Sequence, residues 1–367
     1  MRITLFISRL GAGGADRAMS AMANHWSVQG QQVTLITLGP PQGDFYKLDQ
    51  QVRRIGLGLL ASAGAVARPL RDNLQRLRYL RRAIRESNPD VVISFNAQTN
   101  VLTIVASLGL GIPVIVCEQA DPRQYTIGAP WELLRRFVYP MANAVVVVAS
   151  AMRNWAQQVA RKDAVYFVPN PMAMQLNGHN TLSVKRKRGP VLVAMGRLTY
   201  QKGFDLLLQA FSRCVKKHPD WSLIILGEGE ERNCLESLAA RLGIDTSVRF
   251  PGLVRDAVPI LQGADLFVLS SRYEGFPLAL LEAMACGLAV ISMDCPTGPG
   301  EIISDGKDGV LVPAGDVDAL AAAMDRLMGN KEERERLGIR AVEVKERFGI
   351  EKVMNLWDDV LTRVLCR

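Results

Sequence analysis

The stretch 266–291 reads LFVLSSRYEGFPLALLEAMACGLAVI, and it decides the fold class. It opens with an apolar run of strand length at 266–269 and closes with a second such run at 289–291. Between them, Pro277 suits the first position of a helix, which we expect over 277–285. A strand, a helix and another strand in this order indicate two parallel strands covered by a helix.

Alternation of this kind runs through most of the 367 residues and predicts two doubly wound α/β domains in tandem. In the first half we expect strands at 3–7, 33–37, 91–94, 114–117, 144–148 and 165–168. The helices expected there cover 15–29, 70–86, 99–108, 130–138 and 151–160. In the second half we expect strands at 191–194, 223–226, 248–250, 266–269, 289–291 and 310–312. The helices expected there cover 203–216, 230–242, 277–285 and 317–328, and beyond about 331 the sequence predicts only charged helix.

A Pro-Asn-Pro segment at 169–171 interrupts the alternation, because proline fixes φ and removes a backbone donor. We therefore place the first domain at 1–170, a linker at 171–188 and the second domain at 189–347. The length also fits two domains, since single cores stop growing at roughly 250–300 residues. Doubly wound sheets bind ligands at the carboxyl ends of their strands, so two facing domains imply a cleft between them.

Cysteine and histidine usage argues against a zinc site or a disulfide framework. The six Cys form no CxxC pair, and the three His are scattered along the sequence, so a reducing cytosol is expected. The N-terminal MRITLFISRL lacks the features of a signal peptide. Residues 91–117 carry no charge, but Gly109, Gly111 and Pro113 favour a strand, a helix and a strand over a transmembrane helix.

Two segments are suited to phosphate groups. The segment G-A-G-G at 11–14 precedes a helix, and its glycines let the backbone approach a phosphate. Their spacing is not that of a nicotinamide-binding motif. After the first strand of the second domain come Arg197 and Lys202, whose charges suit a diphosphate. Taken alone, the glycine segment is equally compatible with an ordinary turn, and Arg197 and Lys202 fit a solvated loop better than a diphosphate site.

Two carboxylates flank the start of the helix expected at 277–285. Glu274 lies in the preceding loop, and Glu282 lies inside a helix otherwise made of Leu, Ala and Met, where a carboxylate needs a partner. The amides at the helix start could bind a pyrophosphate between them. A pair of carboxylates is also typical of glycosidases, but the adjacent phosphate-binding features favour a nucleotide-sugar.

At these residues the sequence resembles the retaining glycosyltransferases of the GT-B fold, in glycosyltransferase family 4. The resemblance covers nearly the whole chain and rests on EGFPLALLEAMACGLAVI with its Glu274-x7-Glu282 spacing, GRLTYQKGFDLLLQAF, GAGGADR and the P-N-P crossover. The stretch 291–313 further resembles bacterial members that build capsule, O-antigen or glycoprotein oligosaccharides on a polyprenyl-diphosphate lipid. The resemblance implies two Rossmann-like domains facing across a cleft, with a final helix at 348–367 packing back on the N-terminal, acceptor-binding domain.

The resemblance also implies roles for individual residues. Arg197 and Lys202 match the pair that holds the donor diphosphate and stabilises the leaving nucleotide, and Glu274 matches the residue near the reacting centre of the donor sugar. Glu282 matches the carboxylate that binds the ribose hydroxyls. The other donor-binding candidates are Gly13, Gly14, Gly252, Val254, Gly275, Phe276 and Leu278.

One segment departs from the family pattern. Many relatives carry a His after the fourth or fifth strand of the first domain, whereas this sequence has CEQAD at 117–121. Gln119 can form hydrogen bonds but cannot carry a proton, so Glu118 or Asp121 is the alternative there. Glu118 and Gln119 are therefore candidates for contact with the acceptor.

The net charge of +8 comes from the first half of the chain. Residues 1–175 hold 17 Arg and 2 Lys against 10 acidic residues, a net +9, and residues 176–367 hold 25 basic and 26 acidic residues, a net −1. Residues 68–86 alone contain seven Arg and two acidic residues. An amphipathic helix is expected here, with an apolar stripe made by Leu70, Leu74, Leu77, Leu80 or Arg81, and Ile84.

Seven arginines on one helix repel each other unless they meet anionic groups. We expect them to face an anionic membrane, at about 1 kcal/mol per basic residue, or to hold the diphosphate of a lipid-linked acceptor. The residues concerned are Arg71, Arg78, Arg81, Arg82 and Arg85. Nucleic acid is the weaker alternative, because no aromatic platform accompanies the charge.

The expected activity is retaining transfer of a hexosyl unit (GalNAc, GlcNAc, Gal or Glc) from a UDP-sugar to a polyprenyl-diphosphate-linked glycan. We expect no metal and no cofactor, since Asp316-x-Asp318 is better placed to cap the helix expected at 317–328. The expected location is the cytoplasm, peripheral on the inner face of the cytoplasmic membrane. The alternatives are a GT-B enzyme acting on a soluble acceptor and a non-catalytic subunit that binds nucleotide-sugars.

Overall fold

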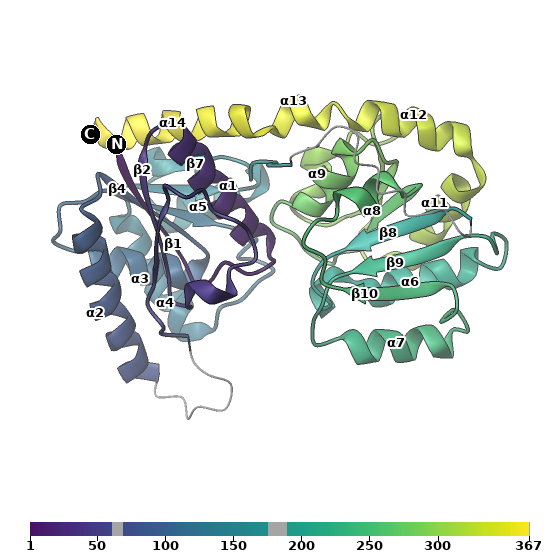
Figure 1. Cartoon of the computed structure of the whole chain (residues 1–367), viewed down its shortest axis with the longest axis horizontal. Helices are drawn as coiled ribbons and strands as arrows, with labels where there is room; N and C mark the ends of the chain where they lie inside the picture. The colour runs from purple at the N-terminus through teal and green to yellow at the C-terminus, as the bar shows by residue number, and fades with distance from the viewer. Residues whose placement is uncertain (61–68, 175–188, 367) are drawn as a thin grey trace. The chain divides into compact units, whose positions relative to one another are not determined.

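The computed structural model describes residues 1–60, 69–174 and 189–366, with the side chains of residues 69 and 70 left out (Figure 1). The chain divides into two compact units. Unit 1 comprises Met1–Ala173 and Phe348–Arg367, and unit 2 comprises Met174–Arg347. The linker expected at 171–188 lies largely outside the described residues.

Unit 1 contains one sheet of seven parallel strands in the order β3-β2-β1-β4-β5-β6-β7. The strands are β1 (Arg2–Ile7), β2 (Gln32–Thr37), β3 (Arg53–Gly56), β4 (Val91–Phe95), β5 (Val114–Glu118), β6 (Ala144–Val147) and β7 (Val165–Phe167). Every residue of β4, β5 and β6 is buried, which requires cover on both faces of the sheet.

Helices supply this cover. They are α1 (Gly14–Val28), α2 (Pro69–Ser87), α3 (Ala97–Ser107), α4 (Ala129–Val138), α5 (Arg153–Val159) and α14 (Ile350–Leu365), with the 3₁₀ turns η1 (Pro41–Gly43), η2 (Tyr139–Met141), η3 (Ser150–Met152) and η4 (Lys162–Ala164). On one face α2 packs on α3 and α3 on α4, as right-handed crossovers between successive parallel strands require. Elsewhere in the unit α1 packs on α14.

The last helix, α14, is held in unit 1 by two tryptophans. The ring of Trp357 is fully buried and lies 6.2 Å from that of Trp26 on α1 and 6.3 Å from that of Phe95. The indole of Trp26 also donates a hydrogen bond of 3.2 Å to Asp358. Burying several aromatic rings makes this contact a substantial part of the core of unit 1.

Unit 2 contains six parallel strands in the order β10-β9-β8-β11-β12-β13. The strands are β8 (Val191–Met195), β9 (Ser222–Leu226), β10 (Val248–Gly252), β11 (Leu266–Leu269), β12 (Val290–Asp294) and β13 (Val310–Pro313). The helices are η5 (Tyr200–Lys202), α6 (Phe204–Cys214), α7 (Arg232–Arg241), α8 (Val258–Gln262), α9 (Leu278–Ala285), α10 (Pro299–Ile302), α11 (Val317–Gly329), α12 (Lys331–Ala341) and α13 (Val344–Phe348). One cluster of buried residues, which includes Phe204, Phe211 and Trp221, fills the interior of this unit.

The α/β fold class expected from the alternation is confirmed in both units. The uncharged stretch 91–117 folds as β4, α3 and β5, as expected. Among the described residues, no helix combines the length and the apolar character needed to cross a membrane. Strand β3 was missed, because its sequence RRIG holds two arginines at the edge of the sheet, one of which pairs with Asp44.

Candidate functional site

The carboxyl edge of the sheet in unit 2 brings two of the three catalytic candidates into direct contact. Lys202 lies in η5, after β8, and Glu274 lies in the loop between β11 and α9. The Lys202 ammonium is 2.6 Å from Oε1 of Glu274, and the two side chains are only 18% and 6% exposed. Seventy-two residues of sequence separate this ion pair, so the parallel topology alone brings it together.

Two hydroxyls complete the environment of Glu274. Ser271 donates a hydrogen bond of 2.6 Å to the same carboxylate oxygen, and Thr297 donates to the backbone carbonyl of Glu274. A buried carboxylate with one cation and one hydroxyl on a single oxygen is held in a fixed direction. Neither hydroxyl was predicted, although Ser271 stands three residues before Glu274 in the same loop.

Arg272 fixes the loop that carries Lys202. Its guanidinium donates two hydrogen bonds, of 2.8 and 2.7 Å, to the carboxylate of Asp205 and a third, of 2.8 Å, to the carbonyl of Tyr200. It also lies 3.9 Å above the centre of the Tyr200 ring. Burial of Asp205 opposes ionisation, but the bonds and charge of Arg272 hold the pKa of this carboxyl below its ordinary value.

Further hydrogen bonds join the same two loops around the Arg272–Asp205 ion pair. The amide of Arg272 donates to the carbonyl of Gln201, the Gln201 side chain donates to Tyr273, and the Ser270 hydroxyl donates to the carbonyl of Lys202. Gly203 follows directly, with φ +62° and the Ser270 carbonyl where a Cβ would lie. The segment from Tyr200 to Gly203 is therefore held against the Glu274 loop at both ends.

Glu282 is buried on α9, a helix of which seven of the eight residues are buried. The helix begins at Leu278, with Pro277 as its N-cap, one residue later than the sequence predicts. Gly298 lies close to Gly275. A Cβ at position 298 would come within 3 Å of the carbonyl oxygen of Gly275 and of the ring of Pro277. Phe276 and Leu278 are buried, so their side chains stabilise the turn.

The other second-domain candidates line the same edge. Arg197 is exposed beyond β8, and no hydrogen bond or ion pair within the described residues engages its side chain. Gly252, with φ +87°, ends β10 and accepts a hydrogen bond from the amide of Gly227. Val254 is half-buried in the loop that follows.

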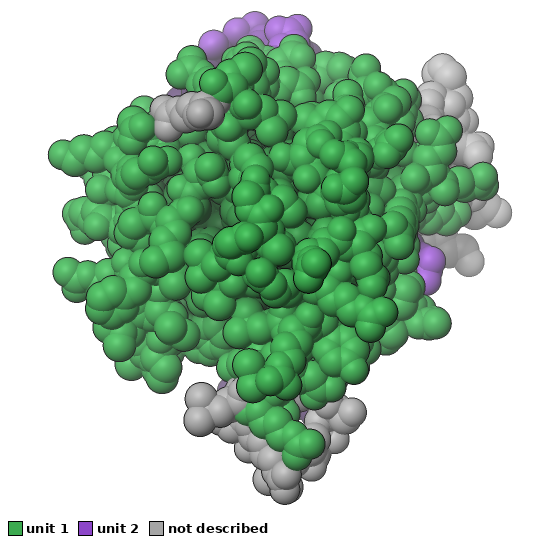
Figure 2. Space-filling view, turned by 90° about the vertical axis from the view of Figure 1, so that its left-hand side faces the viewer, with its two compact units in different colours: residues 1–173, 348–367 green, residues 174–347 purple. Residues whose placement is uncertain are grey.

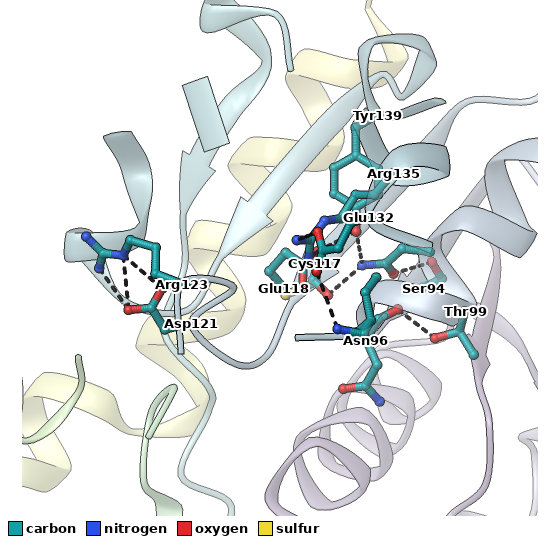
Figure 3. Close-up of polar contacts among 12 residues, drawn as sticks. Ser94, Asn96, Thr99, Cys117, Glu118, Asp121, Arg123, Glu132, Arg135 and Tyr139 are labelled. Atoms are coloured by element: carbon teal, nitrogen blue, oxygen red, sulfur yellow. Dashed lines mark hydrogen bonds and ion pairs between the residues drawn. The ribbon is translucent and has the colours of Figure 1, made fainter. Parts of the chain in front are cut away.

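In unit 1 a buried polar network ends β5 (Figure 3). Tyr139 donates a hydrogen bond to the carboxylate of Glu118, and Arg135 on α4 lies 3.5 Å from it. Asn100 donates to the Tyr139 oxygen at 3.1 Å and to the carbonyl of Cys117 at 3.0 Å. Burial raises the pKa of Glu118, and the neighbouring Arg135 and Tyr139 oppose this only in part.

The carboxylate of Glu118 faces α4 and η2 and is almost inaccessible to solvent, so its contacts here are structural. Asp121 is likewise buried and is bound by the guanidinium of Arg123. Gln119 accepts a hydrogen bond of 2.8 Å from Asn170 and so ties the end of β5 to the P-N-P segment. Both carboxylates that could replace the histidine of related sequences are therefore engaged within unit 1.

Comparison with known proteins assigns the two units. The family model of the glycosyl transferases group 1 matches residues 180–344, and that of the glycosyl transferase 4-like domain matches residues 13–171. A sucrose-phosphate synthase from Thermosynechococcus elongatus has the same fold, with a TM-score of 0.85 at 18% identity over 100% of both chains. The chain belongs to the GT-B glycosyltransferases.

Further relatives of this glycosyltransferase are known. An uncharacterized glycosyltransferase of Haemophilus influenzae is 26% identical over 98% of this chain and 99% of its own length. An α-1,4-N-acetylgalactosaminyltransferase of Campylobacter jejuni, named for an acceptor glycan on undecaprenyl diphosphate, is 27% identical over 99% of both chains. Anabaena HepE, solved in complex with UDP-glucose, shares the fold with a TM-score of 0.80 at 18% identity, over 98% of this chain and 99% of its own.

The glycine loop of this glycosyltransferase lies at the start of α1. Gly13 is the N-cap, and Gly14 is the first residue of the helix. The carboxylate of Asp16 accepts a hydrogen bond of 3.1 Å from the amide of Gly13, so one of the free amides at this helix start already has an internal partner.

The arginine helix of the glycosyltransferase, α2, differs from the expected pattern. Leu80 and Ile84 are fully buried, but Leu74 is 49% exposed, so the predicted stripe was wrong at this position. The side chain of Leu70 lies outside the described residues. The buried side is made by Leu80, Ala83 and Ile84, and the partly buried Leu77 packs against the same cluster.

The predicted arginines of α2 fall into two groups. Arg71, Arg78, Arg82 and Arg85 are exposed, and Arg82 pairs with Glu86 one turn later at 2.7 Å. Arg81 instead lies along the end of α3, where it donates hydrogen bonds of 2.8 and 2.7 Å to the carbonyls of Ala106 and Leu108. It therefore serves as a cap for α3 as well as a surface charge.

Acidic side chains of the second unit have structural partners. Asp316 caps α11 by accepting a hydrogen bond of 2.8 Å from the amide of Ala319, as the sequence predicts, and Asp318 pairs with Arg213. Within the described part of the chain, no group of three or more His, Cys, Asp or Glu side chains is arranged to hold a metal ion.

Proposed function

We propose that this glycosyltransferase transfers a hexosyl unit (GalNAc, GlcNAc, Gal or Glc) from a UDP-sugar to a glycan linked to a polyprenyl diphosphate, with retention of anomeric configuration. The process served is assembly of a bacterial surface polysaccharide or a glycoprotein glycan. The observation that carries the proposal is the Lys202–Glu274 ion pair at the carboxyl edge of a parallel sheet, with Arg197 exposed nearby. The UDP-glucose complex of HepE and the lipid-linked acceptor of the Campylobacter relative support the choice of donor and acceptor.

The proposed chemistry relies on charge. Breaking the bond between sugar and diphosphate leaves additional negative charge on UDP, and Arg197 and Lys202 stabilise that charge in the transition state. Glu274 holds the sugar near the reacting carbon, and Glu282 binds the ribose hydroxyls. A lysine and an arginine take the part that a divalent cation plays in other transferases, so we propose that the reaction needs no metal.

The proposed location follows from the acceptor. A lipid-linked acceptor stays in the membrane, so the enzyme works as a peripheral protein on the inner face of the cytoplasmic membrane. The exposed arginines of α2 supply attraction to anionic lipid.

One experiment tests the activity. The enzyme is incubated in EDTA with a panel of UDP-sugars and a synthetic polyprenyl-diphosphate glycan, and products are read by mass spectrometry. Addition of one hexosyl mass to the lipid-linked glycan is the expected result. Transfer to a soluble sugar alone would favour a soluble acceptor, and binding of UDP without its release from any donor would favour a non-catalytic subunit.

A further inference from the structure

Helix α4 of unit 1 buries an arginine and exposes several large apolar side chains to solvent. Arg135 and Val138 are buried, whereas Leu133, Leu134 and Phe137 are 58%, 45% and 64% exposed. Met141, in the 3₁₀ turn that follows, is 57% exposed. Residues three or four apart along a helix lie on one side, so Leu133, Leu134 and Phe137 form one outward face of α4, and Met141 follows four residues after Phe137.

The buried arginine fixes this orientation. Arg135 makes ion pairs with Glu118 and Glu132, and its guanidinium lies 4.7 Å from the centre of the Trp155 ring. Rotating α4 to hide its leucines would pull this charge out of its buried network and leave Glu118 without a cation. The fold of unit 1 therefore holds Leu133, Leu134 and Phe137 in solvent.

The exposed face of α4 continues into basic surface. Leu108, itself 48% exposed, and Met141 line the same surface hollow at the end of α3. The carbonyl of Leu108 accepts a hydrogen bond from Arg81 of α2, so the apolar face borders the arginine helix. Arg136 on α4 is exposed, and so are Arg78, Arg82 and Arg85, which lie on α2 together with Arg81. Unit 1 is drawn in green in Figure 2, from the side on which α2 lies in Figure 1.

We propose that this surface, which consists of Leu108, Leu133, Leu134, Phe137 and Met141, inserts into the interfacial region of an anionic lipid bilayer. The arginines of α2 and Arg136 would then bind the lipid headgroups. An apolar face bordered by basic residues matches the acyl and headgroup layers of such a bilayer. Tyr125, half-exposed in the loop before α4, adds an aromatic ring of the kind found at this depth.

A second copy of the chain fits this surface less well. In a two-fold dimer the same patch meets itself, so the arginines of two α2 helices would be brought together. Glu86 of α2 and Glu132 of α4 already have partners within unit 1, since Glu86 pairs with Arg82 and Glu132 with Arg135. The charge thus selects an anionic surface over a copy of this chain.

The inference deepens the proposed function, because insertion would hold the enzyme beside a lipid-linked acceptor. Its test uses vesicle binding and needs no activity. The full chain is sedimented with vesicles of phosphatidylcholine alone or with about 30% phosphatidylglycerol, at low salt and at about 0.5 M salt, where charge is screened. We expect binding to the anionic vesicles, with a part that persists in high salt.

Variants separate the two contributions. Leu133→Ser/Phe137→Ser should lower the partition coefficient roughly tenfold or more and abolish the salt-resistant part. Arg78→Gln/Arg82→Gln should remove mainly the salt-sensitive part. The matched control is Ile339→Ser on α12 of unit 2, which removes a side chain that is 74% exposed and should leave binding unchanged.

Two results would overturn the inference. The first is that the Leu133→Ser/Phe137→Ser variant, checked for folding by circular dichroism, sediments with anionic vesicles as much as the wild type does. The second is that the wild type forms a concentration-dependent dimer in the absence of lipid and the variant does not. Transfer to an acceptor on a short, water-soluble lipid should be unchanged in the variant. If wild type fails to transfer with every donor while vesicle binding behaves as expected, the proposed function falls and the membrane surface stands.

Discussion

The ammonium of Lys202 and the carboxylate of Glu274 are 2.6 Å apart, although their loops follow different strands of the sheet in unit 2. The pair couples the residue proposed to stabilise the leaving diphosphate with the residue proposed to hold the sugar. A ligand between the loops would exchange part of this contact for its own charge and hydroxyls. The same two groups therefore act as each other's partners when no donor is bound.

Replacing Lys202 by Ala should lower kcat by about 100-fold to 1,000-fold, the effect of losing one group that stabilises transition-state charge. It should also lower Tm, because Glu274 loses the cation beside its buried carboxylate. The control is Lys217→Ala, which breaks an exposed ion pair with Asp325 in the same unit and should leave kcat unchanged. Initial rates and Tm are measured for both variants, and a rate near wild type for Lys202→Ala would remove this residue from the mechanism.

Arg272 is expected to act as a positioning residue for Lys202. Arg272→Leu removes the anchor on Asp205 and Tyr200, so the loop should move and both KM for the donor and kcat should worsen, by roughly tenfold together. Arg272→Lys should recover only part of this loss, because an ammonium cannot reproduce the bidentate contact.

The partner variant Asp205→Asn provides the control for Arg272. In a double-mutant cycle on kcat/KM, the effects of Arg272→Leu and Asp205→Asn should be less than additive, with a coupling of about 1–3 kcal/mol. Additive effects would mean that Arg272 does not work through Asp205.

Glu118 should make the stability of unit 1 depend on pH. Its pKa is raised above the ordinary value of 4.5 by burial, so the folded state holds the proton more tightly than the unfolded state does. The contribution to stability is therefore complete below the unfolded pKa and is lost as pH rises toward the folded pKa. Glu118→Gln should flatten this fall in Tm above about pH 4.5, whereas Glu86→Gln, on an exposed carboxylate of α2, should leave it unchanged. A variant curve parallel to wild type would contradict the prediction.

The stretch 266–291 was sufficient to predict the strand, helix and strand around Glu274, because apolar runs bounded by Gly and Pro carry that information locally. The pairing of Lys202 with Glu274 followed from topology, since both loops end neighbouring strands. The spacing of residues alone could not predict which side of α4 is buried. The burial of Arg135 depends on Glu118 and Trp155, which are distant in sequence. Arg272 was missed for the same reason, as its partners lie 67 to 72 residues away.

Gly203 should be indispensable for the loop that carries Lys202. Its φ is +62°, and a Cβ would stand 2.1 Å from the backbone carbonyl of Ser270, so Gly203→Ala adds a clash with backbone to an unfavourable conformation. Gly243 has nearly the same φ, +67°, with open space around it, and Gly243→Ala is the matched control. We expect a loss of unfolding free energy of about 1 kcal/mol for Gly243→Ala and of several kcal/mol for Gly203→Ala, with lower kcat only in the latter. Equal losses in urea unfolding would show that the Ser270 carbonyl yields to the methyl group and that the loop does not depend on this close approach.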